Sequence, residues 1–156
     1  STTALVLSNM IAESQLNLTV ITNSLSIVNE LCECPNICIV NIGGSFDINS
    51  RSFRGNITLS SLKNYHADSA FISCSGLSCD FGATDSSEEA ALIRRAMISN
   101  SSYSILLVDS NKFGRCKTNR IADIGQFSVI VTNKMPDEEW FSLCVKHNIS
   151  LNVADS

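Results

Sequence analysis

The sequence predicts an α/β fold, a mainly parallel sheet with helices on both faces. Short β-branched or apolar runs alternate with stretches of helical periodicity, which is typical of this class. Several of the runs are continuously apolar, as expected for strands that helices cover on both sides. The chain has 156 residues, close to the usual size of one compact domain. We therefore expect a single domain over residues 1–156.

The predicted strands comprise residues 18–22, 38–42, 70–73, 104–108, 128–132 and 150–153. The predicted helices comprise residues 3–14, ahead of the first strand, and residues 25–33, 57–65, 87–100 and 137–147, which lie between strands. Pro35 marks the end of the second helix, and Pro136 marks the entrance to the fifth. In the fourth helix, Asp85 followed by Glu88 resembles a capping box. An apolar stripe follows at Ala90, Ile93, Ala96 and Met97.

The charge balance argues against a nucleic-acid surface on this chain. Lys and Arg number 11 against 15 Asp and Glu, and the net charge is −4. A self-sufficient DNA-binding domain usually presents a clustered basic face. If the protein works on DNA, we expect another segment to contact it.

The seven cysteines are an odd set without the regular spacing of a disulfide framework. We expect a reducing, cytoplasmic setting, and the longest apolar runs are too short for a membrane span. Cys32, Cys34 and Cys38 contain no Cys-x2-Cys pair, so we interpret them as buried free thiols rather than metal ligands. We expect neither a metal nor another cofactor.

Small, polar or flexible residues follow the predicted strands. The four stretches, each at or directly after the end of one strand, are Thr22-Asn23-Ser24, Gly43-Gly44, Cys74-Ser75-Gly76 and Asp109-Ser110-Asn111-Lys112. Each could be ordinary turn chemistry. In parallel sheets, however, ligands bind beyond the carboxyl ends of the strands, and the convergence of four such loops favours a binding site.

Three further features suit an anionic, polar ligand. Ser1, Thr2 and Thr3 stand at the start of the first helix, where hydroxyl and N–H groups can hold a phosphate or simply cap the helix. Glu89 lies one turn before Ile93 on the apolar stripe, so we expect a carboxylate that is at least half buried and paired with a ligand hydroxyl or Lys112. Lys112 could reach a ligand phosphate or remain an ordinary surface lysine.

An ordered series of motifs resembles the C-terminal sensor domain of the DeoR family of sugar-metabolism regulators, over nearly the whole chain. The stretches that carry the resemblance are residues 22–31, 43–44, 53–55, 67–76, 82–85, 88–90, 95–98 and 109–114. The resemblance implies a ribose-5-phosphate-isomerase-like domain that binds a phosphorylated sugar and alters a linked winged helix-turn-helix. That DNA-binding segment is absent here, as is the strand that normally leads into the loop matched by residues 1–3.

The resemblance also implies a set of ligand-binding residues, which comprises Ser1, Thr2, Thr3, Thr22, Asn23, Gly43, Gly44, Gly76, Thr84, Asp85, Glu89 and Lys112. The expected mechanism is a population shift, in which the effector favours one arrangement of the sensor domains and so biases the DNA-binding segments. Most members of the family are repressors that their effector relieves, so induction is the default expectation.

Two alternatives remain open at this point. The chain could be a sugar-phosphate isomerase of the same fold, with Glu89 as general base and Lys112 steadying an enediolate. It could also be an interaction module with a vestigial pocket.

Assembly into a homo-oligomer is a further expectation, because regulators that read repeated half-sites need more than one DNA-binding segment. Trp140, Phe141 and Leu143 could supply an apolar contact surface, although we expect at least two of them to pack the last helix onto the sheet.

Overall fold

The computed structural model of the chain describes residues 2–154 and divides into two compact units, residues 1–65 and residues 66–156. We call them the N-terminal unit and the C-terminal unit, and each is described by itself. The expected single domain over residues 1–156 stays a prediction.

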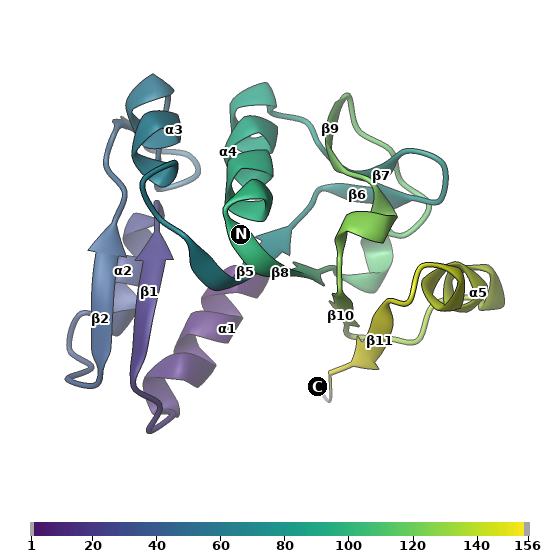
Figure 1. Cartoon of the computed structure of the whole chain (residues 1–156), viewed down its shortest axis with the longest axis horizontal. Helices are drawn as coiled ribbons and strands as arrows, with labels where there is room; N and C mark the ends of the chain where they lie inside the picture. The colour runs from purple at the N-terminus through teal and green to yellow at the C-terminus, as the bar shows by residue number, and fades with distance from the viewer. Residues whose placement is uncertain (1, 155–156) are drawn as a thin grey trace. The chain divides into compact units, whose positions relative to one another are not determined.

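The N-terminal unit contains a pair of parallel strands with three helices and a hairpin (Figure 1). Strand β1 (Leu18–Thr22) pairs in parallel with β2 (Ile37–Asn41), and α2 (Leu25–Leu31) connects them. Helix α1 (Thr2–Glu13) packs against α2. Strands β3 (Ser45–Asp47) and β4 (Ser52–Arg54) form an antiparallel hairpin that leads into α3 (Asn56–Leu62).

The C-terminal unit is built on a four-stranded parallel sheet in the order β11-β10-β8-β5. Its strands are β5 (Ala67–Ser73), β8 (Ser101–Leu107), β10 (Val129–Thr132) and β11 (Ser150–Val153). Helix α4 (Glu88–Ser99) connects β5 to β8, and α5 (Glu138–Lys146) connects β10 to β11. The predicted α/β class, with a parallel sheet flanked by helices, is confirmed.

A second, antiparallel sheet in this unit has the order β6-β7-β9 and lies beside α4 (Figure 1). Its strands are β6 (Gly76–Ser78), β7 (Gly82–Asp85) and β9 (Asn119–Ala122). Two short 3-10 turns follow β8 and β9, namely η1 (Ser110–Lys112) and η2 (Ile124–Gln126). Each of the three strands is only three or four residues long, too short to be predicted from the sequence pattern.

The core of the C-terminal unit joins both sheets and both helices. Leu77 of β6, Leu106 of β8 and Ile130 of β10 are fully buried, and Trp140 of α5 is 5% exposed. The Trp140 ring also meets the Phe113 ring edge to face, with 4.8 Å between the centroids.

All six predicted strands and all five predicted helices are present, with ends shifted by up to three residues. The prediction of a capping box at Asp85 and Glu88 is wrong. Ser87 is the N-cap of α4, and its hydroxyl accepts a hydrogen bond from the Ala90 N–H at 3.3 Å. The Asp85 carboxylate instead accepts from the Ser87 N–H, so the helix starts two residues later than a cap at Asp85 would allow.

Two burial predictions also differ from the structure. Glu89 is exposed, whereas Ile93, one helical turn later on the same side of α4, is buried. Burial on this side of the helix therefore does not extend back to Glu89. Cys32 and Cys38 are exposed and Cys34 is only partly buried, so these three residues are not the buried thiols that we expected. They lie after α2 and within β2, outside the packed core.

Of the three late apolar residues, Trp140 is buried and Leu143 packs against the core, whereas Phe141 is 53% exposed. The expectation that at least two of them pack the last helix is confirmed. Between residues 2 and 154, no helix combines the length and the apolar character that crossing a bilayer requires.

Candidate functional site

Beyond the carboxyl ends of two parallel strands in the C-terminal unit lie a buried thiol and Lys112, and Arg94 of α4 also influences the thiol. Cys74 directly follows β5 and is 3% exposed. Burial raises the pKa of its thiol to about 11, while the positive charges of Lys112 and Arg94 act in the opposite direction. The thiol is therefore neutral at pH 7, and both cations lie close enough to influence it.

Lys112 is the last residue of η1 and is partly buried. Two hydrogen bonds hold this turn in place, one to the residue before it and one to the loop after β10. The Asp109 carboxylate accepts from the Asn111 N–H at 2.9 Å, and the Asn133 side-chain oxygen accepts from the Ser110 N–H at 2.8 Å. The loops after β8 and β10 are thus joined at the edge where ligands bind in parallel sheets.

Asp85 ends β7 and forms a buried ion pair with Arg94. The Arg94 Nη1 lies 2.8 Å from the Asp85 carboxylate, and the two side chains are 21% and 8% exposed. The same carboxylate accepts from the Ser75 hydroxyl and from the Ser87 N–H, both at 2.9 Å. Because these donors compensate a buried negative charge, Asp85 ties the start of α4 to the turn after β5.

Gly76 and Thr84 shape the antiparallel sheet and the segment that packs on it. Thr84 is fully buried, and its hydroxyl donates to the Gly76 carbonyl at 3.1 Å and accepts from the Lys117 N–H at 2.9 Å. A Cβ atom at Gly76 would lie 2.6 Å from the Arg115 carbonyl oxygen. The absence of a side chain there lets residues 115–117 approach the sheet.

Glu89 lies in the first turn of α4, where a carboxylate interacts favourably with the helix dipole. Its exposure leaves it accessible to a ligand, but the expected pairing with Lys112 stays a prediction.

In the N-terminal unit, Thr22 and Asn23 fasten the loop after β1. Thr22 is buried, and its hydroxyl accepts from the Ser24 N–H at 3.1 Å. The Asn23 amide donates to the Phe53 carbonyl at 2.7 Å, and the Phe53 N–H donates to the Asn23 carbonyl at 2.8 Å. This loop therefore holds the β3–β4 hairpin beside the end of β1.

Gly43 and Gly44 follow β2 and contact α3 through Thr58. The fully buried Thr58 hydroxyl donates to the Gly43 carbonyl at 2.8 Å. Gly44 has φ of +147°, and a Cβ atom there would lie 2.1 Å from the Thr58 hydroxyl oxygen. Only glycine fits this position without a shift of its neighbours.

The hairpin carries an ion pair between Asp47 and Arg54. Hydrogen bonds from the Ser50 side chain and backbone, and from Arg54, lower the pKa of Asp47 to about 2. The carboxylate accepts from the Ser50 hydroxyl at 2.6 Å and from its N–H at 2.8 Å.

The hydroxyl cluster expected at residues 1–3 cannot be placed completely. Ser1 and the side chain of Thr2 lie outside the described part of the chain. Helix α1 begins at Thr2, and Thr3 is partly buried within it. The phosphate-binding role of these three residues stays a prediction.

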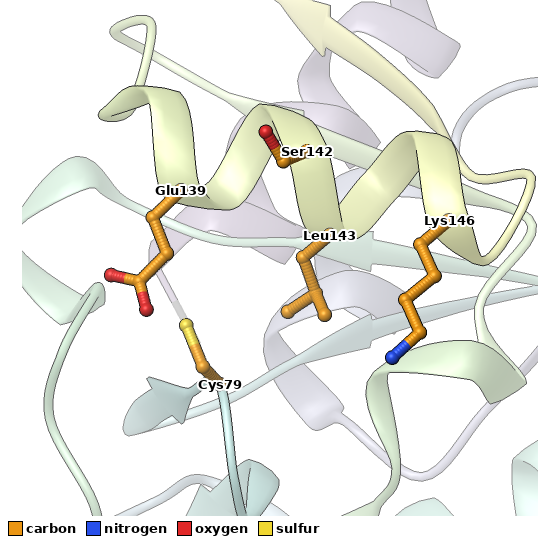
Figure 2. Close-up of a pocket in the computed structure, with 5 residues that line it drawn as sticks. All are labelled: Cys79, Glu139, Ser142, Leu143 and Lys146. Atoms are coloured by element: carbon orange, nitrogen blue, oxygen red, sulfur yellow. The ribbon is translucent and has the colours of Figure 1, made fainter.

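A groove in the C-terminal unit lies between α5 and the end of β6 (Figure 2). It has a volume of about 220 Å³ and is lined by Cys79, Glu139, Ser142, Leu143 and Lys146. Figure 2 shows the side chains of Glu139, Leu143 and Lys146 on the side of α5 that faces Cys79. The volume is below the roughly 300–1,000 Å³ of typical ligand pockets, and none of the predicted binding residues lines it.

The thiol of Cys79, which lines this groove, is poorly suited to nucleophilic chemistry. Burial, followed by the negative charge of Glu139, raises the pKa of Cys79. Within residues 2–154, no group of His, Cys, Asp and Glu side chains is arranged to hold a metal ion.

Several polar residues lie at strand ends as predicted, but their partners were not predicted from the sequence. Arg94, Ser75 and Arg54 lie within or beside the motifs that carry the family resemblance, yet their roles depend on partners distant in sequence. Arg94 could have been noticed because it follows Asp85 by nine residues, on the helix that Asp85 precedes.

Comparison with known proteins shows which family the chain belongs to. The family model described as the DeoR C terminal sensor domain matches residues 1–134. The uncharacterized HTH-type transcriptional regulator YulB of Bacillus subtilis is 36% identical over 133 residues, which cover 85% of this chain and 51% of that protein.

Two other relatives are similar at lower identity. The HTH-type transcriptional repressor GlcR of Bacillus subtilis is 28% identical over 88% of this chain and 53% of its own length. The L-fucose operon activator of Haemophilus influenzae is 28% identical over 84% of this chain and 53% of its own length. The chain spans about half the length of the curated relatives it matches. On the family match over residues 1–134, we conclude that this chain belongs to the family of DeoR C-terminal sensor domains.

Proposed function

We propose that the chain is the effector-binding domain of a DeoR-type transcriptional regulator that acts in the cytoplasm. It binds a phosphorylated sugar and shifts the DNA-binding state of a winged helix-turn-helix carried elsewhere in the parent protein. The relatives include a repressor and an activator by name, and we propose repression of a sugar-utilisation operon as the default.

The observation that carries the proposal is the position of Lys112. It is partly buried at the carboxyl edge of a parallel sheet, on a turn that two side-chain hydrogen bonds fix. A lysine held at this edge is a suitable point charge for a phosphate. Arg94 lies near the same thiol but is engaged by Asp85, so Lys112 is the better candidate for direct contact with the anion.

The test is thermal unfolding of the chain with a panel of phosphorylated sugars and their unphosphorylated parents. We expect a phosphorylated compound to raise the melting temperature and its parent to have little effect. At a ligand concentration about 100 times Kd, the gain is about 2.7 kcal/mol. A panel without any shift would favour the vestigial-pocket alternative.

Two variants locate the site. Lys112→Ala and Glu89→Gln are each expected to weaken binding by about 1 to 3 kcal/mol, the range for a hydrogen bond to a charged group. Lys134→Ala, an exposed lysine two residues beyond β10, is the matched control. Circular dichroism checks the fold, and normal binding by both variants would refute the assignment of these residues.

Catalysis is not part of the proposal. A non-enzyme function fits the relatives, which are transcriptional regulators by name. The isomerase alternative predicts turnover of pentose or hexose phosphates that Glu89→Gln abolishes. We expect no isomerised product by NMR after long incubation.

We also propose that the sensor domain self-associates, as expected for a regulator of repeated half-sites. Sedimentation equilibrium at micromolar concentration should show a dimer or tetramer. Monomer alone, with and without effector, would assign the oligomer contact to another part of the parent protein.

A further inference from the structure

Thr132 is the last residue of β10, at the carboxyl edge of the parallel sheet. Its side chain lies on the same face of the sheet as that of Ile130, two residues earlier. Ile130 is fully buried in the core and lies opposite Leu106 of β8. Thr132 therefore ends a column of core side chains with a hydroxyl group.

The Thr132 hydroxyl is buried and unpaired. The residue is 3% exposed, and its Oγ1 has no hydrogen-bond partner among the described residues. The backbone carbonyl of Thr132 is satisfied, because it accepts from the Ala154 N–H at 2.8 Å. Burial of a hydroxyl without a partner costs free energy that valine, with nearly the same shape, would avoid.

The other buried threonines show how this chain ordinarily treats such groups. The hydroxyls of Thr22, Thr58 and Thr84 each have a hydrogen-bond partner at 2.8 to 3.1 Å. Thr132 differs from all three in that its hydroxyl has no such partner among the described residues. It also lies at the carboxyl edge of the parallel sheet, where ligands bind in such folds.

The next residue connects Thr132 to the proposed site. The Asn133 side chain accepts from the N–H of Ser110, the first residue of η1, and Lys112 is the last residue of the same turn. A buried hydroxyl without a partner and a partly buried lysine thus belong to two loops joined by a hydrogen bond.

We propose that Thr132 is a ligand-contacting residue whose hydroxyl pairs with an oxygen of the phosphorylated sugar. The hydroxyl can donate to a phosphate or ring oxygen and accept from a sugar hydroxyl. A site with a buried hydroxyl rejects analogues that lack the matching oxygen, because the protein group then stays unpaired. Thr132 is therefore a specificity-determining residue, and this inference rests on the proposed function.

The first experiment compares ligand-free variants of the chain. Thr132→Val should unfold at the same temperature as the wild type or higher, because it removes an unpaired buried hydroxyl. Thr84→Val is the matched control, and it should unfold at a lower temperature because the Thr84 hydroxyl has two partners. A fall for Thr132→Val comparable to that for Thr84→Val would overturn the inference, since the hydroxyl would then have a structural partner.

The second experiment measures binding of four probes, namely glucose 6-phosphate, fructose 6-phosphate, ribose 5-phosphate and glycerol 3-phosphate. For each probe that the wild type binds, Thr132→Val should raise Kd about tenfold or more, and Thr132→Ser should retain binding because it keeps the hydroxyl. Unchanged binding by Thr132→Val would overturn this inference alone. If the wild type binds none of the four, the proposed function fails for these ligands and the role of Thr132 is rejected with it.

Discussion

Replacement of Gly44 by alanine should destabilise the N-terminal unit, whereas the same change at the neighbouring Gly43 should not. A Cβ atom at Gly44 would lie 2.1 Å from the Thr58 hydroxyl oxygen and 2.7 Å from the Arg54 carbonyl oxygen. A Cβ atom at Gly43 would meet no atom of the described residues within 4 Å. The two adjacent glycines therefore give a matched pair of substitutions.

The cost at Gly44 has three sources. Overpacking typically costs about 1–3 kcal/mol. The backbone at φ of +147° is unfavourable for an L side chain, at about 1–3 kcal/mol. A displaced Thr58 would also lose its hydrogen bond to the Gly43 carbonyl, which contributes about 1 kcal/mol. We expect a loss of about 3 kcal/mol or more for Gly44→Ala, and for Gly43→Ala no loss or a gain of up to about 1 kcal/mol.

Urea unfolding followed by circular dichroism measures the free energies, and hydrogen exchange of peptides from residues 2–65 locates the effect. Amide hydrogen exchange of β2, β4 and α3 should be faster than in the wild type for Gly44→Ala and unchanged for Gly43→Ala. Equal stability of the two variants would refute the close contact between Gly44 and Thr58.

Three further predictions concern charges and thiols. Asp85→Ala should lower the free energy of unfolding by about 3 kcal/mol, because it removes the carboxylate that pairs with the partly buried Arg94 and accepts from Ser75 and Ser87. The exposed control Asp80→Ala should change it by less than about 0.5 kcal/mol in the same urea titration, and equal effects would contradict the ion pair. Because the pKa of Asp47 is lowered to about 2, its stabilising contribution is complete above about pH 4 and is lost as the pH falls through 2. Asp47→Asn should flatten the dependence of unfolding on pH in this window, and an unchanged profile would count against the lowered pKa. Cys74, buried and with a pKa of about 11, should resist iodoacetamide at pH 8 while the exposed Cys116 reacts, and mass spectrometry of labelled peptides distinguishes them.

Local patterns were sufficient to predict the main elements of the fold. The apolar runs around Ile39, Leu106 and Ile130 became parallel strands, because continuous apolar stretches are stable only where both faces are covered. Pro136 predicted the entrance to α5, which begins at Glu138 after the N-cap Asp137, because the ring of proline holds φ close to the helical value. These signals act over a few residues and depend little on the rest of the chain.

The contacts and the burial of the residues in the candidate site could be determined only from the tertiary structure. The sequence placed Asp85 and Lys112 at ends of predicted elements but assigned Asp85 to the wrong cap and predicted burial of Glu89. Residues 89 and 93 are one helical turn apart on the same side of α4, so only the packing around the helix decides that Ile93 is buried while Glu89 is exposed.

By itself, the sequence determined the α/β class, the order of the long elements and the sensor-domain family. Periodicity and motif order depend only on the order of residues along the chain. Only the tertiary structure decided that Asp85 pairs with Arg94, that Gly44 rather than Gly43 is sterically required, and that the buried hydroxyl of Thr132 has no partner within residues 2–154. Each of these depends on whether a side chain meets a group from a distant part of the chain. In a packed interior, such pairing decides whether a polar group is stabilised or left available to a ligand.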